Sequence, residues 1–257
     1  MKREQLQRYS RQLKLAQIGP AGQERLLTSH VLLIGAGGLG SAAGAYLAGL
    51  GIGRLTVLDP DVVEISNLHR QLLHRDADAG RPKAESARRT LGAINPQIDI
   101  VTVPVQADAA NLPRYVQAAD VVVDGCDNFA TRFAVNAACV AAGRPLVSGA
   151  AIRFEGQLTV LRPDLGGPCY RCLYRDEDSQ AETCAVNGVL PPVVGVIGAL
   201  QAMEAVKVLL GLGTPAAGRL LLYDGLAAQW RELRFPRDPA CPVCGGTTGG
   251  TTGTTAP

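Results

Sequence analysis

Closely spaced glycines are the first residues in the sequence with an evident chemical use. The pattern G-x-G-x-x-G, with one extra glycine, is made by Gly35, Gly37, Gly38 and Gly40. Such glycines let the backbone approach a phosphate, and the N-terminus of a following helix supplies unpaired N–H groups and a positive dipole end. Asp59 ends the next apolar run, where an acid normally binds a ribose hydroxyl pair. By itself the motif predicts a dinucleotide site and favours an oxidoreductase.

Cations and amides that follow Asp59 change the expected ligand to a triphosphate. They are Asn67, Arg70 and Gln71, and then Lys83 at the first turn of a predicted helix. A nicotinamide enzyme has little use for arginine and lysine there, whereas the concentrated charge of a triphosphate needs such partners. For Lys83 alone, a solvated helix position is the plainer interpretation. Together these residues predict an ATP site.

A carboxylate and an amide, Asp127 and Asn128, come just after the apolar run 121–123. This places them at the carboxyl edge of a predicted sheet, where ligands bind in open α/β folds. Asp127 has the chemistry to hold Mg²⁺ between phosphates. The alternative for Asp127 is a cap on the next helix. We expect both residues in the nucleotide site.

Two Cys-x-x-Cys pairs predict a metal site. They are Cys169 with Cys172 and Cys241 with Cys244, and each pair stands among glycine and proline. Four thiolates bind Zn²⁺ tetrahedrally and leave no open position, so the zinc should be structural. A redox pair would usually stand at a helix start, and neither pair is predicted to do so.

The remaining cysteines have different surroundings. Cys126 lies beside the predicted sheet and Cys139 in an apolar helix, so both are expected in the core. Cys184 follows the acidic run 176–183, which predicts an exposed loop. Acidic neighbours work against a reactive thiolate, so we favour a non-covalent role and keep a covalent one open.

Strand and helix patterns alternate through the first part of the chain. Strands are predicted at 30–34, 54–58, 98–103, 121–123 and 146–148, and helices at 41–50, 83–94 and 133–141. After residue 151 come predicted strands 157–161 and 220–223, with a helix at 195–210. The fold class is therefore α/β: a doubly wound, Rossmann-like, mainly parallel sheet extended by antiparallel strands. A helical N-terminal arm and a four-cysteine zinc knob complete it.

Length and charge limit the class of protein. The 257 residues suit one α/β domain at 1–246, with the arm at 1–29 and a disordered Gly/Thr tail at 247–257. A net charge of +2 argues against nucleic acid as the partner. The start of the chain is polar, and the longest apolar stretch is broken by proline and glycine. We expect no membrane contact and a cytoplasmic location.

Several segments together resemble the MoeB/ThiF family, the bacterial relatives of ubiquitin-activating enzymes. They are 8–12 (RYSRQ), the glycine motif with Asp59, 66–71 (SNLHRQ), Lys83, Asp127-Asn128 and 193–198 (VVGVIG). The resemblance covers about residues 8–245 and is closest to the MoeB branch through segments 147–153 and 201–207.

That resemblance implies a homodimeric adenylation domain that binds ATP·Mg²⁺. It assigns the ribose to Asp59, the phosphates to Asn67, Arg70 and Lys83, and the metal to Asp127. It also implies that Arg11 reaches in from the other subunit.

The implied reaction is adenylation of a ubiquitin-like sulfur carrier that ends in Gly-Gly, a MoaD-like protein of molybdopterin synthesis. The product is an acyl-adenylate, and pyrophosphate is released. Because the carboxylate is already ionised, the barrier is bringing two anions together, which needs cations and a metal rather than a general base. The three histidines, His30, His69 and His74, are therefore expected to take no part.

Three alternatives stay open from the residues. One is ThiF-like activation of a thiamine or tRNA-thiolation carrier with covalent use of Cys184. A second, more distant one is an NAD-dependent oxidoreductase. A third is a carrier-binding scaffold without turnover, which the presence of Arg11, Arg70 and Asp127 disfavours.

Overall fold

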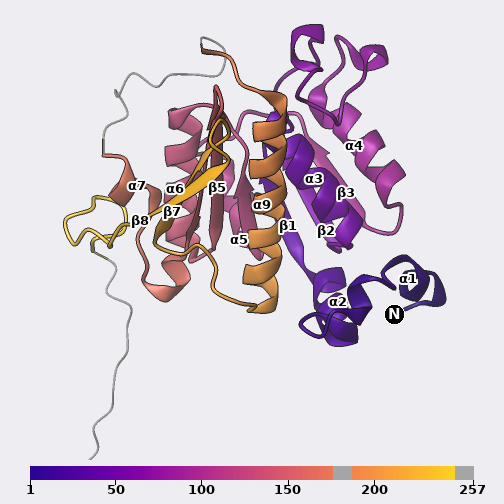
Figure 1. Cartoon of the computed structure of the whole chain (residues 1–257), viewed down its shortest axis with the longest axis horizontal. Helices are drawn as coiled ribbons and strands as arrows, with labels where there is room; N and C mark the ends of the chain where they lie inside the picture. The colour runs from indigo at the N-terminus through magenta and orange to yellow at the C-terminus, as the bar shows by residue number, and fades with distance from the viewer. Residues whose placement is uncertain (176–186, 247–257) are drawn as a thin grey trace, which may run out of the picture.

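A computed structural model describes residues 1–175 and 187–246, and its centre is one eight-stranded sheet (Figure 1). The strand order is β3-β2-β1-β4-β5-β6-β7-β8. The strands are β1 (His30–Ile34), β2 (Arg54–Leu58), β3 (Asp99–Val103), β4 (Val121–Asp124), β5 (Leu146–Ile152), β6 (Glu155–Leu161), β7 (Arg219–Asp224) and β8 (Gln229–Arg234). Neighbours from β3 to β5 are parallel, and β5 to β8 pair antiparallel. The doubly wound sheet with an antiparallel extension is confirmed.

Side chains of the parallel strands alternate between two hydrophobic cores, one on each face of the sheet. Leu33 and Val57 belong to one buried cluster, which α3 (Gly38–Leu50), α4 (Lys83–Ile94) and α9 (Pro191–Leu210) cover. Leu32 and Val122 belong to the other, beneath α5 (Leu112–Ala118) and α6 (Phe129–Ala142). Adjacent residues of a strand point to opposite faces, so this division follows from the period of two.

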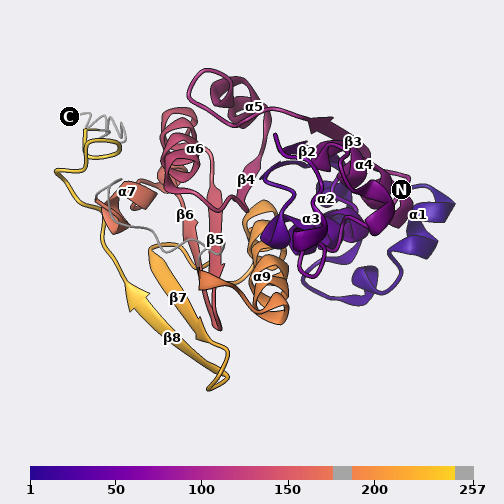
Figure 2. The same ribbon diagram turned by 90° about the horizontal axis from the view of Figure 1, so that it is seen from above.

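The antiparallel end of the sheet is less covered. Figure 2 shows the β7–β8 hairpin projecting from the body of the molecule. All six residues of β8 are exposed, and Tyr223 of β7 packs against Trp230 with ring centroids 4.7 Å apart. The sequence interpretation missed β8, because its side chains lack a buried face that would impose an apolar alternation.

Helix α9 is long and apolar enough to cross a membrane by composition, but it packs inside the fold. It contacts α3 and strands β4, β5 and β6, and buries Gln201 and Glu204 along with its apolar residues. The Gln201 side chain donates to the Asp124 carbonyl at 2.6 Å. These contacts are those of a core helix.

The predicted helical arm is confirmed at the N-terminus. It contains α1 (Arg3–Arg8), a 3-10 turn at Gln12–Lys14 and α2 (Gly19–Thr28). Figure 1 shows α1 and α2 together at the end of the molecule where β1 begins. This is the amino end of the parallel strands, opposite the edge at which β1 leads into the glycine motif.

Most predicted elements agree with the structure to within a few residues. Three helices begin earlier than expected: α3 at Gly38, inside the glycine motif, α6 at Phe129 and α9 at Pro191. Helix α5 was not predicted. The tail at 247–257 and the acidic loop at 176–186 lie outside the described residues.

Candidate functional site

A cavity of about 410 Å³ lies at the carboxyl edge of the parallel strands. Nine of the predicted nucleotide residues line it: Gly35, Gly37, Gly38, Asp59, Arg70, Gln71, Lys83, Asp127 and Asn128. Among the described residues, Gly40, Asn67 and Arg11 stand outside this lining. Most residues predicted for the nucleotide site thus line one cavity, and the three exceptions have separate structural reasons.

The glycine motif turns the chain from β1 into α3 at the floor of the cavity. Gly35 has φ of 88°, a left-handed conformation that favours glycine. Gly40 is required for packing, because a Cβ there would lie 1.9 Å from the Gly35 carbonyl oxygen. Gly37 is the N-cap of α3, so the free N–H groups and positive dipole end of that helix border the cavity. This is the geometry of an anion site.

Asp59 follows β2 and is buried beside the glycine motif. One carboxylate oxygen accepts from the Ala36 N–H at 2.7 Å, and the other from the Asp61 N–H at 2.9 Å. Burial raises the pKa of Asp59 above its ordinary value, and the Ala36 hydrogen bond acts against that rise. The side chain thus ties the loop to β2 while it lines the cavity, where a ribose could reach its remaining lone pairs.

Four cationic residues line the cavity, Arg70, Lys83, Arg132 and Arg231, and the first two are those predicted for phosphate. Lys83 is buried at the first turn of α4, and its Nζ lies 2.8 Å from the Asp61 carboxylate. Arg70 donates from Nη2 to the Asn67 side-chain oxygen at 2.7 Å. Asn67 does not line the cavity itself, but its side chain orients that of Arg70, which does. Gln71 is buried in the same wall, and its Oε1 has no hydrogen-bond partner among the described residues. A buried acceptor of this kind suits a ligand that brings a donor, such as a ribose hydroxyl.

Asp127 and Asn128 follow β4, as predicted, and have different roles. The Asn128 side chain accepts from the Thr131 N–H at 2.9 Å and caps α6. The cap of that helix is thus Asn128, whereas the alternative considered from the sequence was Asp127. Asp127 lines the cavity, so its carboxylate is available to a cation there.

A buried ion pair supports the loop that carries Asp127, and the sequence interpretation did not find it. Arg132 donates to the carbonyls of Cys126 at 2.6 Å and Gly149 at 2.9 Å, and lies 3.7 Å from Asp124. Burial disfavours the charged guanidinium, but Asp124 outweighs it, so the pKa of Arg132 lies above its ordinary value. The available signal was an arginine inside the otherwise apolar α6. Cys126 and Cys139 are buried core residues, as expected.

Arg11 is exposed on the N-terminal arm, at the other end of the sheet from the cavity. The arm is fixed there by Tyr9, which covers Gly51 at the end of α3 and accepts from Asn95 at 2.9 Å. Arg11 is therefore separated from the cavity of its own chain by the length of α3. Cys184 lies outside the described residues.

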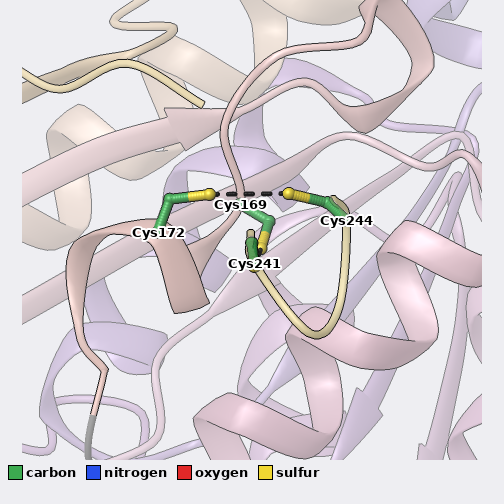
Figure 3. A group of neighbouring side chains, drawn as sticks. All are labelled: Cys169, Cys172, Cys241 and Cys244. Atoms are coloured by element: carbon green, nitrogen blue, oxygen red, sulfur yellow. Dashed lines mark hydrogen bonds between the residues drawn. The ribbon is translucent and has the colours of Figure 1, made fainter. Parts of the chain in front are cut away.

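The four predicted metal-binding cysteines converge, as Figure 3 shows. Their sulfur atoms all lie within 4.8 Å of one another, with Cys169–Cys241 at 3.6 Å and Cys172–Cys244 at 3.5 Å. A tetrahedral Zn²⁺ with Zn–S bonds of about 2.3 Å needs sulfur–sulfur distances of about 3.8 Å. The donor set and its spacing therefore fit zinc.

The surroundings affect the sulfur atoms of the cluster unequally: burial raises the pKa of Cys169 and of Cys244 above the ordinary thiol value. Burial raises the pKa of Cys241, but N–H groups of Cys244 and Val243 outweigh it and bring this pKa to about 7. The Asp238 N–H points at the Cys172 sulfur from 3.4 Å. The expectation that neither pair stands at a helix start is wrong for the first pair, because Cys169 caps the short helix α7 (Tyr170–Leu173). Clustering with the second pair, rather than helix position, separates this site from a redox pair.

A family model described as the ThiF family matches residues 9–243, which contain the cavity and three of the four cysteines. The chain belongs to the ThiF family. It is 51% identical over 242 residues to an Escherichia coli molybdopterin-synthase adenylyltransferase, covering 94% of the chain and 97% of that protein. It is 48% identical to the E. coli sulfur carrier protein ThiS adenylyltransferase, covering 93% of the chain and 95% of that protein.

A solved structure and a further relative agree with this assignment. The crystal structure of E. coli MccB with ATP superposes with a TM-score of 0.78 at 26% identity, covering 87% of this chain and 68% of that one. A Haloferax volcanii SAMP-activating enzyme E1 is 48% identical, over 94% of the chain and 89% of that protein. The expected resemblance to the MoeB/ThiF family is confirmed.

Proposed function

We propose that this ThiF-family chain is an ATP-dependent adenylyltransferase that activates the C-terminal glycine carboxylate of a ubiquitin-like sulfur carrier. The main observation in support is that one cavity combines a helix N-terminus with Arg70, Lys83 and Asp127. The names of the E. coli relatives support the same reaction class. A nicotinamide oxidoreductase would have no use for two cations beside the ribose acid.

The reaction joins a carboxylate oxygen of the carrier to the α-phosphorus of ATP and breaks the bond from that phosphorus to the β-phosphate oxygen. The products are an acyl-adenylate and pyrophosphate. Asp59 would hold the ribose, while Arg70 and Lys83 neutralise phosphate oxygens as charge moves onto the leaving group. Asp127 would hold Mg²⁺, which supplies charge neutralisation between the phosphates. Positioning and electrostatics carry the rate, so no general base is required.

A homodimer is the assembly that this function requires if Arg11 takes part. Arg11 lies on the far side of α3 from its own cavity, so it would have to serve the cavity of a second copy. Exposed apolar side chains on the packed helices α3 and α9, Tyr46, Val196 and Met203, offer a surface that a second copy would cover. A lone copy would leave these side chains in water.

Zinc at the four cysteines would be structural in this proposal. All four sulfurs are used, so no position is left for a substrate. The cluster joins α7 to the end of the described chain, 72 residues apart in sequence for each close pair. Its role would be to hold that distant segment against the body of the domain.

The carrier is proposed to be the MoaD-like protein of molybdopterin synthesis. The 48% identity to a ThiS adenylyltransferase favours a thiamine carrier as the second candidate, with covalent use of Cys184. We expect the enzyme to act in the cytoplasm, where ATP·Mg²⁺ and the carrier are its two substrates.

The deciding experiment is carrier-dependent ATP–pyrophosphate exchange with each candidate carrier in turn. Exchange with the MoaD-like carrier above that with the thiamine carrier supports the proposal, and the reverse order selects the second candidate. A carrier truncated by its two terminal glycines is the matched control and should give no exchange. Titration with NADH in place of ATP·Mg²⁺ tests the oxidoreductase alternative. Tight binding of NADH would support that alternative.

A further inference from the structure

His74 is a buried histidine that the reaction does not use, and its ring contacts the nucleotide loop from behind. It is 5% exposed and lies outside the cavity lining. Its Nε2 is 2.9 Å from the carbonyl oxygen of Ala36, the residue between Gly35 and Gly37 of the glycine motif. The N–H of the same residue donates to Asp59. Both polar groups of Ala36 are therefore held from outside the loop.

The opposite ring nitrogen is fixed by a polar chain that leads to α4. Nδ1 of His74 is 2.9 Å from the Ser86 hydroxyl, which donates to the Asp78 carboxylate at 2.8 Å. Asp78 also accepts from the Arg75 N–H at 3.1 Å and from the Arg89 guanidinium. Ser86 lies on α4, the helix whose first turn carries Lys83. Helix α4 therefore carries Lys83 at its first turn and is also connected to the glycine loop, through Ser86 and His74.

Hydrogen-bond chemistry determines which ring nitrogen carries a proton. A backbone carbonyl can only accept, so Nε2 must be protonated to bond Ala36. Nδ1 can accept from Ser86 in the neutral ring, if the single hydroxyl proton turns from Asp78 to the ring, or donate to Ser86 in the imidazolium while Ser86 donates to Asp78. The bond to Ala36 exists in both states. Burial lowers the pKa of His74, with Lys83 acting in the same direction and Asp59 and Asp78 against it.

We propose that His74 is a positioning residue that fixes the backbone of the nucleotide loop through the Ala36 carbonyl and so sets the affinity for ATP·Mg²⁺. The inference rests on the proposed ATP-dependent function. It gives a role to a histidine that the sequence interpretation set aside. If the loop were free to move, ATP would have to order its N–H groups on binding, which costs free energy. His74 holds the loop before ATP binds, so part of that cost is avoided.

Two amide variants separate the two ring contacts. In His74→Gln the side-chain amide reaches about as far as Nε2 and can still donate to Ala36. In His74→Asn the shorter amide can satisfy Ser86 but cannot reach the loop. We expect His74→Gln to bind ATP·Mg²⁺ within about threefold of wild type and His74→Asn about tenfold more weakly. In the Asn variant the buried Ala36 carbonyl would keep only the long hydrogen bond from the Ser41 hydroxyl, at 3.4 Å.

His30, on the strand that leads into the glycine loop, provides a matched control. Its ring also bonds a backbone carbonyl, that of Ala118 at 2.8 Å, but at the start of β1, away from the loop. Dissociation constants for ATP·Mg²⁺ are measured by calorimetry on the whole chain, with melting temperatures recorded for each variant. His30→Asn should bind as wild type even if its melting temperature falls as much as that of His74→Asn.

The possible results distinguish a failure of the His74 proposal from a failure of the proposed function. A His74→Asn protein that binds ATP·Mg²⁺ as wild type would overturn the role of His74 and leave the proposed function standing. Weakening confined to His74→Gln would assign the effect to the Ser86 side, and equal weakening in both His74 variants would assign it to loss of the ring itself; either result would also overturn the role. The ratio of Asn-variant to wild-type constants should be the same at about pH 6 and pH 8. A ratio that falls to one at the higher pH would mean attraction by imidazolium charge instead. Wild-type protein that fails to bind ATP·Mg²⁺ at all would refute the proposed function itself.

Discussion

Arg11→Ala should lower the rate of carrier-dependent pyrophosphate exchange at least a hundredfold while the protein still folds and dimerises. The distance argument is geometric. Helix α3 has 13 residues and therefore rises about 20 Å from the glycine motif to the arm. An arginine side chain cannot span that length, so within one chain Arg11 can only form surface contacts, worth at most about 1 kcal/mol. Supplied to the phosphates by a partner subunit, an arginine is worth roughly 10³–10⁵ in rate, or about 4–7 kcal/mol.

The assay that assigns Arg11 to a subunit is complementation. Arg11→Ala and Asp127→Ala proteins are mixed under conditions of proven subunit exchange. In a heterodimer, one site has both an intact Asp127 and an Arg11 from the partner. Random exchange in a two-fold dimer leaves about a quarter of all sites complete, so about a quarter of wild-type activity should return. Lys14→Ala, a neighbouring exposed cation on the same arm, serves as the control and should stay within a few-fold of wild type.

The refuting result is specific. A mixture that stays as inactive as its parents, despite exchange, would show that Arg11 does not act across the interface. Full activity in the single Arg11→Ala variant would remove it from the reaction altogether.

Three further predictions concern the four-cysteine cluster, Cys184 and Lys83. Cys172→Ser should lower stability sharply, because structural zinc contributes roughly 10–16 kcal/mol against a net domain stability of ~5–15 kcal/mol; thermal unfolding and elemental analysis test this, and wild-type protein without zinc would contradict it. Cys184→Ala should keep carrier-dependent exchange within a few-fold of wild type; a carrier adduct on a non-reducing gel that vanishes in the variant would favour the covalent alternative. Lys83→Met should lower kcat about 10²-fold by removing a preorganised phosphate partner, and steady-state exchange kinetics with unchanged kcat would exclude that role.

The lining of the cavity was predictable because its parts are local in sequence. The glycines, Asp59 and Lys83 each follow or begin an element with a strong apolar pattern, and parallel strands bring their carboxyl ends to one edge. The convergence of the four cysteines was predictable because two Cys-x-x-Cys pairs have the spacing typical of a zinc site. In both cases one residue type at one spacing has few other uses.

The missed features depend on tertiary contacts that leave no local trace. Arg132 is recognisable only once β4 and β5 bring Asp124 and the Gly149 carbonyl to it. The role of His74 depends on two partners, Ala36 and Ser86, which are far from it in sequence. Asn67 was assigned to phosphate, whereas its observed contact is with Arg70. A single sequence gives the residue types but not these pairings.

The N-terminal arm is built as a fixed part of the fold, which bears on how Arg11 would work. The last carbonyls of a helix lack internal partners, and at the end of α3 the arm supplies them. Gln12 and Gln23 both donate to the Leu50 carbonyl, at 3.2 and 3.0 Å. On the other side of Arg11, the buried Tyr9 packs against the same helix end. Arg11 thus lies between two anchored residues, so its backbone is ordered before any partner or nucleotide binds. An arginine presented so far from its own cavity, on a segment too well held to swing across, can serve ATP only where a second copy brings its cavity to the arm.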